Sequence, residues 1–397
     1  MGANMSVMLS TRAATAMYVG AVLGPGVTFL PALAARIAGP ASLLAWGALL
    51  ALSVPVAITF ALLGVRHPDA GGTASYARAA FGPRAGRVTG WWFLSSVVVG
   101  APAVSLIGGF YVSVLVGGGR ATAIAVAAAM IAIVVAANVA SLSTGARLQL
   151  WLAGVLAVLL LVASLAALPH ARAANWAPFA PHGWGAVGTA ASVLMFSFIG
   201  WEAGSHLVGE LGDPRRQLPR AIGGAFAVVV VLYLVLAVAT IGIRSSSAVP
   251  LADLMGAGFG APGRAVTAGL AVLLTLGAMN TYVAAATRLF GTLAPEVRLP
   301  PLVPFVLIAA VILVPLAFDV LSLDGLVRAT SVGFVAVYVL AMAAGVRLLE
   351  GRARAAAMVA LAAMLVVFAF SGPYLVIPAV VALVAGRNRR TALTSRA

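Results

Sequence analysis

Runs of about twenty apolar residues, each long enough to span a bilayer as a helix, recur along this chain from one end to the other. They restrict its fold more than any other feature. Of the 397 residues, 63% are hydrophobic and only 8% are charged. No stretch between the runs is long enough for a soluble domain of about 100 residues. We therefore expect an all-α polytopic membrane protein and not a soluble enzyme with a membrane anchor.

We expect twelve transmembrane helices, separated by the Arg, Pro and Gly residues that interrupt the apolar runs. Inside a bilayer a helix satisfies its own backbone hydrogen bonds, so each run is interpreted as a helix. The last two runs are separated only by Ser371, Gly372 and Pro373 and could also form one long helix. The expected spans cover residues 9–36, 40–65, 85–117, 121–140, 144–168, 186–211, 218–243, 264–291, 301–318, 326–347, 355–371 and 374–386.

The distribution of arginine supports the count of twelve, because cytoplasmic loops of membrane proteins carry an excess of positive charge. With the N-terminus in the cytoplasm, 18 of the 24 arginines fall inside, and the six outside are Arg36, Arg120, Arg172, Arg244, Arg264 and Arg328. Eleven spans would place the basic tail outside. We therefore expect a multi-pass protein of a bacterial inner membrane with both termini in the cytoplasm.

The composition argues against several other classes of protein. A net charge of +15 would indicate nucleic acid binding in a soluble protein, but these arginines lie in separate loops, so no nucleic acid partner is expected. The chain has no cysteine, no H-E-x-x-H pattern and no G-x-S-x-G pattern, which are signs of metal or nucleophile chemistry. We expect no enzyme activity, no metal and no cofactor. Four loop residues are expected only to be solvated: His170, His182, Asp319 and Asp324.

Two of the expected spans are interrupted near the middle of the membrane. The first contains GAVLGPGVTFLPALA, residues 20–34, in which Gly24, Pro25 and Gly26 are poor helix formers. The sixth contains VLMFSFIGWEAGSHLVGEL, residues 193–211, with a glycine at position 200. Backbone can leave a helix at this depth only where protein covers it or where it lines a cavity.

Broken helices five spans apart are typical of inverted-topology repeats, in which the breaks mark the substrate site. Amides that start a half-helix bind a carboxylate, and carbonyls that end one accept hydrogen bonds from an ammonium group, so a zwitterion fits between them. The alternative is that the first break is only a kink, or that Gly20 and Gly24 form a close-packing face. We expect a first repeat in residues 1–168, a second in 186–347, two extra helices in 355–386 and a basic tail in 387–397.

Three stretches of the chain resemble the amino acid–polyamine–organocation (APC) superfamily of permeases. The first is GAVLGPGVTFLPALAA, residues 20–35. The second, HPDAGGTASYARAAFGPRAGRVTGWWF, matches at Pro68, Gly71, Gly72, Tyr76, Gly82, Gly90 and Trp91. The third, FSFIGWEAGSHLVGELGDPRRQLPRAI, matches at Phe198, Gly200, Glu202, Glu210, Pro214, Arg216, Pro219 and Arg220. Within the superfamily the chain looks closest to bacterial exporters of methionine and branched-chain amino acids.

The resemblance implies a LeuT-like five-plus-five inverted repeat with discontinuous helices one and six, plus two C-terminal helices, working by alternating access. It places the substrate carboxylate on backbone near Gly24, Gly26 and Val27. It places the amino group near carbonyls of Val22, Phe196 and Ile199, with Phe196 as an aromatic lid. The whole expected substrate-binding set is Val22, Leu23, Gly24, Pro25, Gly26, Val27, Thr28, Phe196, Phe198, Ile199, Gly200, Trp201 and Asn280.

One residue departs from the superfamily pattern. Between the two glycines of the first break the family usually has Ser or Thr, which supplies an amide and a hydroxyl. Pro25 supplies neither, although proline suits the first turn of a helix. Thr28, one turn later, could offer a substitute hydroxyl.

Acidic residues inside a membrane are costly and point to function. Glu202, His206 and Glu210 are spaced i, i+4 and i+8 on one helical face. Glu202 and His206 are coupling or gating candidates, as a proton relay toward the cytoplasm. The alternative is structural: Glu202 accepts local backbone hydrogen bonds, and Glu210 pairs with Arg216 or Arg220.

Several other polar or aromatic residues remain open between two roles. Asn280 and Thr281, and likewise Ser95 and Ser96, either line the cavity or form interhelical hydrogen bonds. Trp201 faces either substrate or lipid.

Apart from Glu202, no charged residue lies in the expected cavity segments, so a neutral, apolar side chain suits their Val, Leu, Phe and Ile walls. We therefore expect a secondary transporter of neutral amino acids that exports methionine and branched-chain amino acids. The alternative is an importer or exchanger of another small amino acid or amine on the same fold. The oligomeric state stays open between monomer and homodimer, and the coupling ion stays open, with the proton as a candidate.

Overall fold

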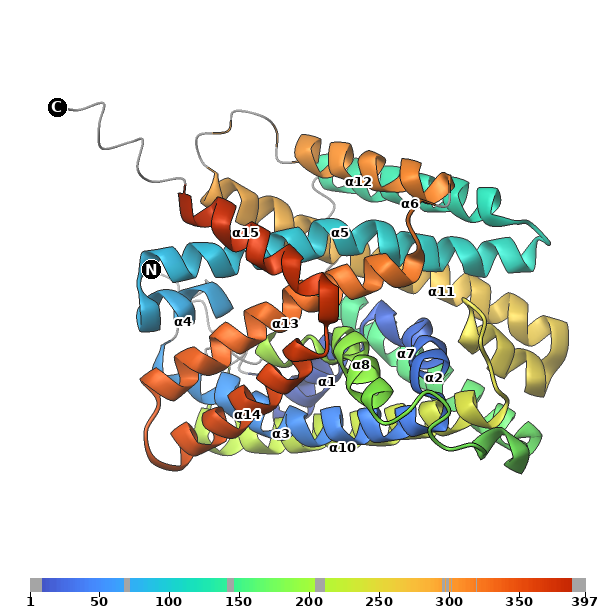
Figure 1. The fold of residues 1–397 in the computed structure, drawn as a ribbon, viewed down its shortest axis with the longest axis horizontal. Helices are drawn as coiled ribbons and strands as arrows, with labels where there is room; N and C mark the ends of the chain where they lie inside the picture. The colour runs from blue at the N-terminus through green and yellow to red at the C-terminus, as the bar shows by residue number, and fades with distance from the viewer. Residues whose placement is uncertain are drawn as a thin grey trace, which may run out of the picture.

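The computed structural model describes residues 9–67, 72–140, 146–203, 211–294, 302–318 and 320–387, together with residues 297 and 300. Within these residues the chain is almost entirely helical, and β pairing is limited to one bridge between Leu9 and Leu211. Figure 1 shows the long helices running roughly along the longest axis of the molecule.

The helices follow the apolar runs because each run satisfies its backbone within itself. In the first half they are α1 (Thr11–Val22), α2 (Leu30–Ala38), α3 (Ser42–Arg66), α4 (Gly72–Phe81), α5 (Pro83–Leu115), α6 (Arg120–Val139) and α7 (Ala146–Ala167). In the second half they are α8 (Gly185–Leu194), α10 (Pro214–Gly242), α11 (Pro250–Leu293), α12 (Leu302–Ala317), α13 (Leu323–Leu348), α14 (Gly351–Ala369) and α15 (Val376–Arg387). Short 3₁₀ helices join them: η1 (Pro25–Thr28), η2 (Gly39–Ala41), η3 (Leu168–His170), η4 (Ala173–Trp176), η5 (Met195–Phe198), η6 (Trp201–Ala203) and η8 (Gly372–Leu375).

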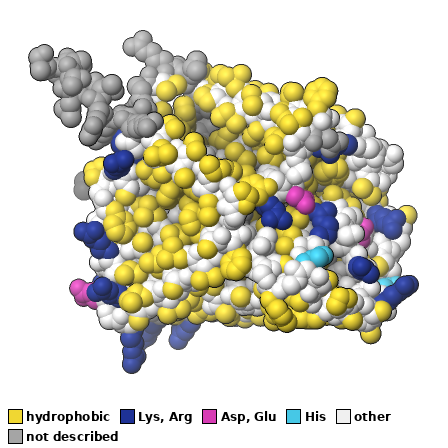
Figure 2. All heavy atoms as spheres, in the orientation of Figure 1, with side chains coloured by type: hydrophobic (Ala, Val, Ile, Leu, Met, Phe, Trp, Pro, Cys, Tyr) yellow, Lys and Arg dark blue, Asp and Glu magenta, His cyan; other side chains and the backbone are white. Residues whose placement is uncertain are grey.

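Eight helical stretches of the described chain are long and apolar enough to cross a membrane, and three shorter apolar helices accompany them. In the face shown in Figure 2, arginine side chains gather toward the two ends of the molecule and hydrophobic side chains cover much of the surface between them. This distribution is the one expected for a bundle with its long axis across a bilayer.

Two helical segments differ from the expected spans. The connection between the expected spans 40–65 and 85–117 contains an additional helix, α4, which was not among the expected spans. The helix α11 begins at Pro250, well before residue 264, and bends at Gly260, where φ is +63°. Proline at the first helical position favours this early start, and glycine tolerates the left-handed conformation at the bend.

The helices α5 and α13 form the centre of the bundle, and α6 and α14 lie at its periphery. The most apolar windows of α5 and α13 are 78% and 72% buried inside the protein, against 28% for α6 and 22% for α14. Both central helices contact each other, and they cross the middle of the view in Figure 1. A cavity in the middle of the bundle therefore lies beside α5 and α13.

Candidate binding site at two interrupted helices

The first break lies between α1 and α2. The Leu23 amide closes the last turn of α1 on the Val19 carbonyl oxygen at 2.8 Å. Gly24 is then extended, with φ −84° and ψ 171°, and η1 starts at Pro25. Proline at this position needs no amide partner, so the same short sequence ends one helix and starts the next.

The second break lies between η5 and η6. Ile199 is extended, with φ −73° and ψ 135°, and Gly200 follows with φ +132°. Residues other than glycine rarely adopt such a φ. The chain therefore leaves its helix here because a glycine stands at position 200.

The two breaks touch each other at Gly200. A methyl group on Gly200 would lie 2.2 Å from the Ala21 carbonyl oxygen and 2.8 Å from the Val22 amide nitrogen. A methyl group on Gly26 would lie 2.8 Å from Phe196 Cδ1. The unwound segments, far apart in the sequence, thus lie in direct contact, which requires glycine on both sides.

A tyrosine hydroxyl ties the two breaks together. Tyr233 of α10 shares its proton between the Ser197 carbonyl oxygen at 2.7 Å and the Val22 carbonyl oxygen at 3.1 Å. Its ring packs edge-on against Trp46 and Phe198, with centroids 5.1 and 5.3 Å away. The Val22 carbonyl, an expected acceptor for the substrate amino group, is thus already hydrogen-bonded in this conformation.

The backbone amides of the first break are likewise directed at neighbouring carbonyls. The Gly24 amide donates to the Val22 carbonyl oxygen at 2.8 Å, and the Val27 amide lies 3.4 Å from the Gly24 carbonyl oxygen. The Thr28 carbonyl oxygen accepts from the Tyr111 hydroxyl at 2.7 Å. For a carboxylate to bind at Gly24 and Val27, this segment has to exchange internal hydrogen bonds for bonds to the ligand.

Glu202 joins the second break to α13. Its Oε2 accepts the Gly200 amide at 2.9 Å and also accepts the Tyr338 hydroxyl. The Gly200 amide lies 3.1 Å from the same hydroxyl oxygen. Glu202 therefore makes the local backbone hydrogen bond of the structural alternative and, in addition, a side-chain bond to a central helix. His206 and Glu210 lie outside the described residues.

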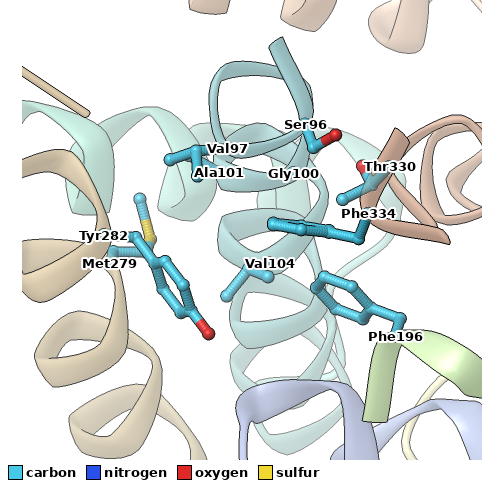
Figure 3. Close-up of a pocket in the computed structure, with 10 residues that line it drawn as sticks. All are labelled: Ser96, Val97, Gly100, Ala101, Val104, Phe196, Met279, Tyr282, Thr330 and Phe334. Atoms are coloured by element: carbon cyan, nitrogen blue, oxygen red, sulfur yellow. The ribbon is translucent and has the colours of Figure 1, made fainter. Parts of the chain in front are cut away.

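A cavity of about 20 Å³ lies beside the breaks, between α5, α11 and α13. Because Phe196 lines it, we call it the cavity under Phe196. Figure 3 shows Met279 and Tyr282 reaching toward it from α11 and Phe334 from α13, with Phe196 beside Phe334. The two phenylalanine rings are 6.2 Å apart. This volume is close to the least that holds one water molecule, about 10–15 Å³. In the described conformation this cavity is too small for an amino acid, which fits here only after Phe196 or its neighbours move.

Of the expected substrate-binding residues, Phe196 lines this cavity. Phe198 packs against Trp46, and Trp201 packs against Tyr18 with ring centroids 6.3 Å apart. Trp201 is 1% exposed, so in this conformation it faces protein and not lipid. Most of the remaining apolar members of the set are buried beside the breaks: Val22, Leu23, Val27 and Ile199.

The polar residues that the sequence left undecided either form interhelical hydrogen bonds or line the cavity. The Asn280 Oδ1 accepts from Asn138 Nδ2 of α6 at 2.8 Å, and the Thr281 hydroxyl accepts from Gln149 Nε2 of α7 at 2.8 Å. Both therefore form interhelical hydrogen bonds. Ser96 lines the cavity, and its hydroxyl donates to the Trp92 carbonyl oxygen at 2.7 Å.

Sequence reasoning missed the residues that wall the cavity opposite the breaks. Met279 and Tyr282 on α11, and Thr330 and Phe334 on α13, line it. Their spacings of three and four place each pair on one helical face. A search for large or hydroxyl-bearing side chains at those spacings would have proposed both pairs.

Comparisons with known proteins agree with this architecture. The amino acid permease family matches residues 9–391. The chain belongs to the amino acid permease family. The permease is 34% identical over 389 residues to the uncharacterized amino acid permease YecA of Bacillus subtilis, covering 93% of this chain and 92% of YecA. It is 32% identical over 360 residues to the L-methionine/branched-chain amino acid exporter YjeH of Escherichia coli, covering 85% of each.

A solved structure shows the same fold as the permease. The crystal structure of MhsT in complex with L-phenylalanine aligns with a TM-score of 0.61 at 13% identity, covering 96% of this chain and all of that one. The resemblance to APC permeases is thereby confirmed, and family and fold are those of multi-pass membrane transporters.

At one end of the permease an ion pair joins α2 to α13. The Arg36 Nη2 lies 2.9 and 3.0 Å from the two carboxylate oxygens of Asp324. The expectation that Asp324 is only solvated is therefore wrong, because folding brings an arginine of the first half of the chain beside it. Asp319 lies outside the described residues.

Proposed function

We propose that the permease is a secondary transporter of neutral amino acids that works by alternating access. The observation that carries this proposal is the contact between two unwound helix segments at Gly200, beside a cavity under Phe196. Unwound backbone inside a membrane offers both donors and acceptors, which suits a zwitterion. A closed cavity that has to enlarge before it admits a ligand suits a carrier and not an open pore.

Unpartnered polar groups at the breaks support the same proposal. The Tyr18 hydroxyl, the Ser197 hydroxyl and the Trp201 indole nitrogen are buried without a hydrogen-bond partner among the described residues. A buried polar group without a partner is costly. Such groups are retained where another conformation, or a ligand or water in it, supplies the partner.

We propose methionine and branched-chain amino acids as substrates, moved outward. The cavity is walled by apolar side chains, among them Val97, Val104, Met279 and Phe334, and apolar walls favour a neutral, apolar side chain. The similarity to YjeH supports the same substrates and the outward direction. The second candidate is import or exchange of another small amino acid or amine, because alternating access is reversible and gradients set its direction.

We further propose the topology expected from the sequence. It has twelve spans in a bacterial inner membrane, cytoplasmic termini, and five-plus-five inverted repeats in residues 1–168 and 186–347, followed by two extra helices and a basic tail. The matched positions of the two breaks support the repeat. The excess of arginine in the loops that this topology places in the cytoplasm, 18 of 24, supports the orientation.

We propose Glu202 as the coupling or gating residue, with the proton as the coupled ion. The bonds of Glu202 to the Gly200 amide and the Tyr338 hydroxyl connect the second break to α13. Protonation would neutralise the carboxylate and weaken its hydrogen bonds to both donors. That change would loosen the second break against α13, which is how a proton could bias the conformation.

The transport proposal is tested by counterflow in proteoliposomes. Vesicles loaded with unlabelled methionine or leucine should accumulate the labelled amino acid by exchange, because a carrier moves substrate in both directions. A channel would pass flux without exchange, and an enzyme would alter the substrate chemically. Absence of exchange for every neutral amino acid in a panel would refute the proposal.

The coupling proposal is tested with Glu202→Gln, assayed at two pH values. We expect the variant to lose the pH dependence of transport while it keeps exchange, because glutamine cannot titrate. Glu350→Gln, at an exposed position before α14, is the matched control and should behave like the wild type. Unchanged pH dependence in Glu202→Gln rules the coupling role out.

A further inference from the structure

A second, larger cavity lies at the end of the molecule that carries the Arg36–Asp324 pair. Its volume is about 420 Å³, within the range of about 300–1,000 Å³ typical of small-molecule sites. Its walls come from the end of α2, from the loop between α7 and α8, and from the end of α10 with the segment that follows it. We call it the outer pocket. None of its lining residues belongs to the breaks or to the cavity under Phe196.

The loop wall of the outer pocket is fastened on both sides. Toward α2, the Ala41 amide donates to the Phe179 carbonyl oxygen at 2.8 Å, and His182 Nδ1 lies 2.9 Å from the Ile37 carbonyl oxygen. Toward α10, Asn175 Nδ2 donates to the Gly242 carbonyl oxygen at 2.7 Å. These hydrogen bonds fix the loop that walls the pocket. His182 contributes one of them, so its role is more than solvation of the loop.

The lining of the outer pocket is cationic. Arg36, Arg244 and His182 line it, and its lining residues include no carboxylate. Arg36 is paired with Asp324, whereas the Arg244 side chain has no hydrogen-bond or ion-pair partner among the described residues. Asp253 lies behind the lining, where its carboxylate accepts hydrogen bonds from the Ser245 and Ser247 hydroxyls, both at 2.6 Å. The guanidinium of Arg244 is therefore the cationic group of the lining that is left for a ligand.

Arg244 is held in place by its backbone. It adopts a left-handed conformation, φ 54°, just past the end of α10. Its amide donates to the Ile241 carbonyl oxygen at 2.9 Å, and the next amide donates to the Thr240 carbonyl oxygen at 3.0 Å. A helix commonly ends in this way, but a residue with a Cβ at this position is unusual.

We propose that the outer pocket binds a small organic carboxylate, such as the α-carboxylate of an amino acid, through the guanidinium of Arg244. The Arg244 side chain has no partner among the described residues, and a guanidinium binds a carboxylate through two parallel hydrogen bonds. Apolar residues in the same lining, Pro40, Pro178 and Ile241 among them, suit an organic ligand more than an inorganic anion. That the carboxylate belongs to the transported amino acid rests on the proposed function; the binding of a carboxylate does not.

The site is tested by protection of Arg244 from phenylglyoxal, an arginine reagent, in the purified full-length protein. Modification at each arginine is quantified by peptide mass spectrometry. At a ligand concentration about four times the Kd, acetate and L-methionine should slow modification of Arg244 about fivefold, because about four fifths of the sites are then filled. L-Methioninamide, which lacks the carboxylate, should not protect, and neither should sulfate. Arg264, exposed and outside the pocket lining, should react at an unchanged rate.

Equal reactivity of Arg244 with and without acetate overturns the proposal. Equal protection by sulfate also overturns it, because the pocket would then bind anions in general. Protection by acetate but not by methionine keeps the carboxylate site and removes its link to the transported amino acid. These results do not depend on transport. Failure of the carboxylate site can therefore be distinguished from failure of the proposed transport function.

A transport measurement completes the test. With substrate supplied from the side of the outer pocket, Arg244→Gln should raise the KM about tenfold, the effect of losing one hydrogen bond to a charged group. The maximal rate should stay unchanged, and Arg264→Gln should match the wild type. Arg244→Lys keeps the positive charge but loses the two-pronged guanidinium group. Its KM should therefore lie between those of the wild type and Arg244→Gln. An unchanged KM in a folded, monodisperse Arg244→Gln protein would show that the transported substrate does not use the pocket.

Discussion

Gly200 is the residue on which the contact between the two breaks depends. Its φ of +132° is available to glycine and rarely to other residues, and the position where a Cβ would stand is filled by the Ala21 carbonyl. A strained backbone inside a membrane persists only where the surroundings hold it. Here Glu202 and Tyr338 do so, through their bonds at the Gly200 amide.

We expect Gly200→Ala to separate the two breaks and to abolish exchange. The added methyl group would lie 2.2 Å from a backbone oxygen, which cannot give way as a flexible side chain can. Overpacking of this kind costs about 1–3 kcal/mol, with a further cost for the backbone conformation. The measurements are the midpoint of thermal unfolding in detergent and counterflow in proteoliposomes.

Gly223→Ala is the matched control for that substitution. Gly223 lies in α10 with nothing within 4 Å of the place where a Cβ would stand, and alanine is the better helix former by about 0.5–1 kcal/mol. Its unfolding midpoint should stay level or rise. A Gly200→Ala protein as stable and active as this control would contradict the close contact.

At the scale of elements, the interrupted helix formed by α1, η1 and α2 has Pro25 where the superfamily pattern predicts Ser or Thr. The segment starts its second half without an amide at that position, and its Gly24 and Val27 amides are directed at internal carbonyls. A carboxylate bound there would therefore have few free donors. If the substrate carboxylate binds at this element, as proposed, the missing donor at Pro25 should weaken that binding.

We expect Pro25→Thr to lower the KM for transported amino acids about threefold to tenfold, because one restored hydrogen bond contributes about 0.5–1.5 kcal/mol. Substrate KM is measured in exchange. Thr28→Val is the converse test. If the Thr28 hydroxyl binds the substrate, its removal should raise the KM. Equal or weaker affinity in Pro25→Thr would count against the account of the missing donor.

At the scale of the whole molecule, an ion pair between Arg36 and Asp324 lies at the end of the bundle that carries the outer pocket. The pair joins α2, the second half of the first broken helix, to the central helix α13. Both side chains are partly exposed, 36% and 41%. A pair of this kind contributes about 0.2–1 kcal/mol, enough to shift a conformational equilibrium without deciding the fold.

We expect Asp324→Asn to increase access to the cavity under Phe196 up to about fivefold, the shift that loss of about 1 kcal/mol allows. The chain has no cysteine, so a single cysteine introduced at the cavity residue Val104 reports access through its rate of maleimide labelling. Asp213→Asn removes a different ion pair, with Arg216 at the start of α10, and should leave labelling unchanged. A rise in labelling in both variants would show general loosening instead.

The sequence alone determined the membrane class, the position of most helices and the place of both breaks. These features are local: an apolar run of sufficient length has to be helical in a bilayer, and Gly24, Pro25, Gly26 and Gly200 are poor helix formers. The motifs around them also identified the family. The residues of α4 and the early start of α11 were missed, because both fall in connections where short helices depend on packing.

Only the tertiary structure decided which groups meet. Tyr233 reaches carbonyls of both breaks, Tyr338 reaches Glu202, and Arg36 pairs with Asp324, in each case across tens to hundreds of residues of chain. The cavity under Phe196 and the outer pocket exist between helices and not within any one of them. Periodicity and composition report what a segment does by itself, whereas these contacts depend on which helix faces lie together, and that is set by packing of the entire bundle.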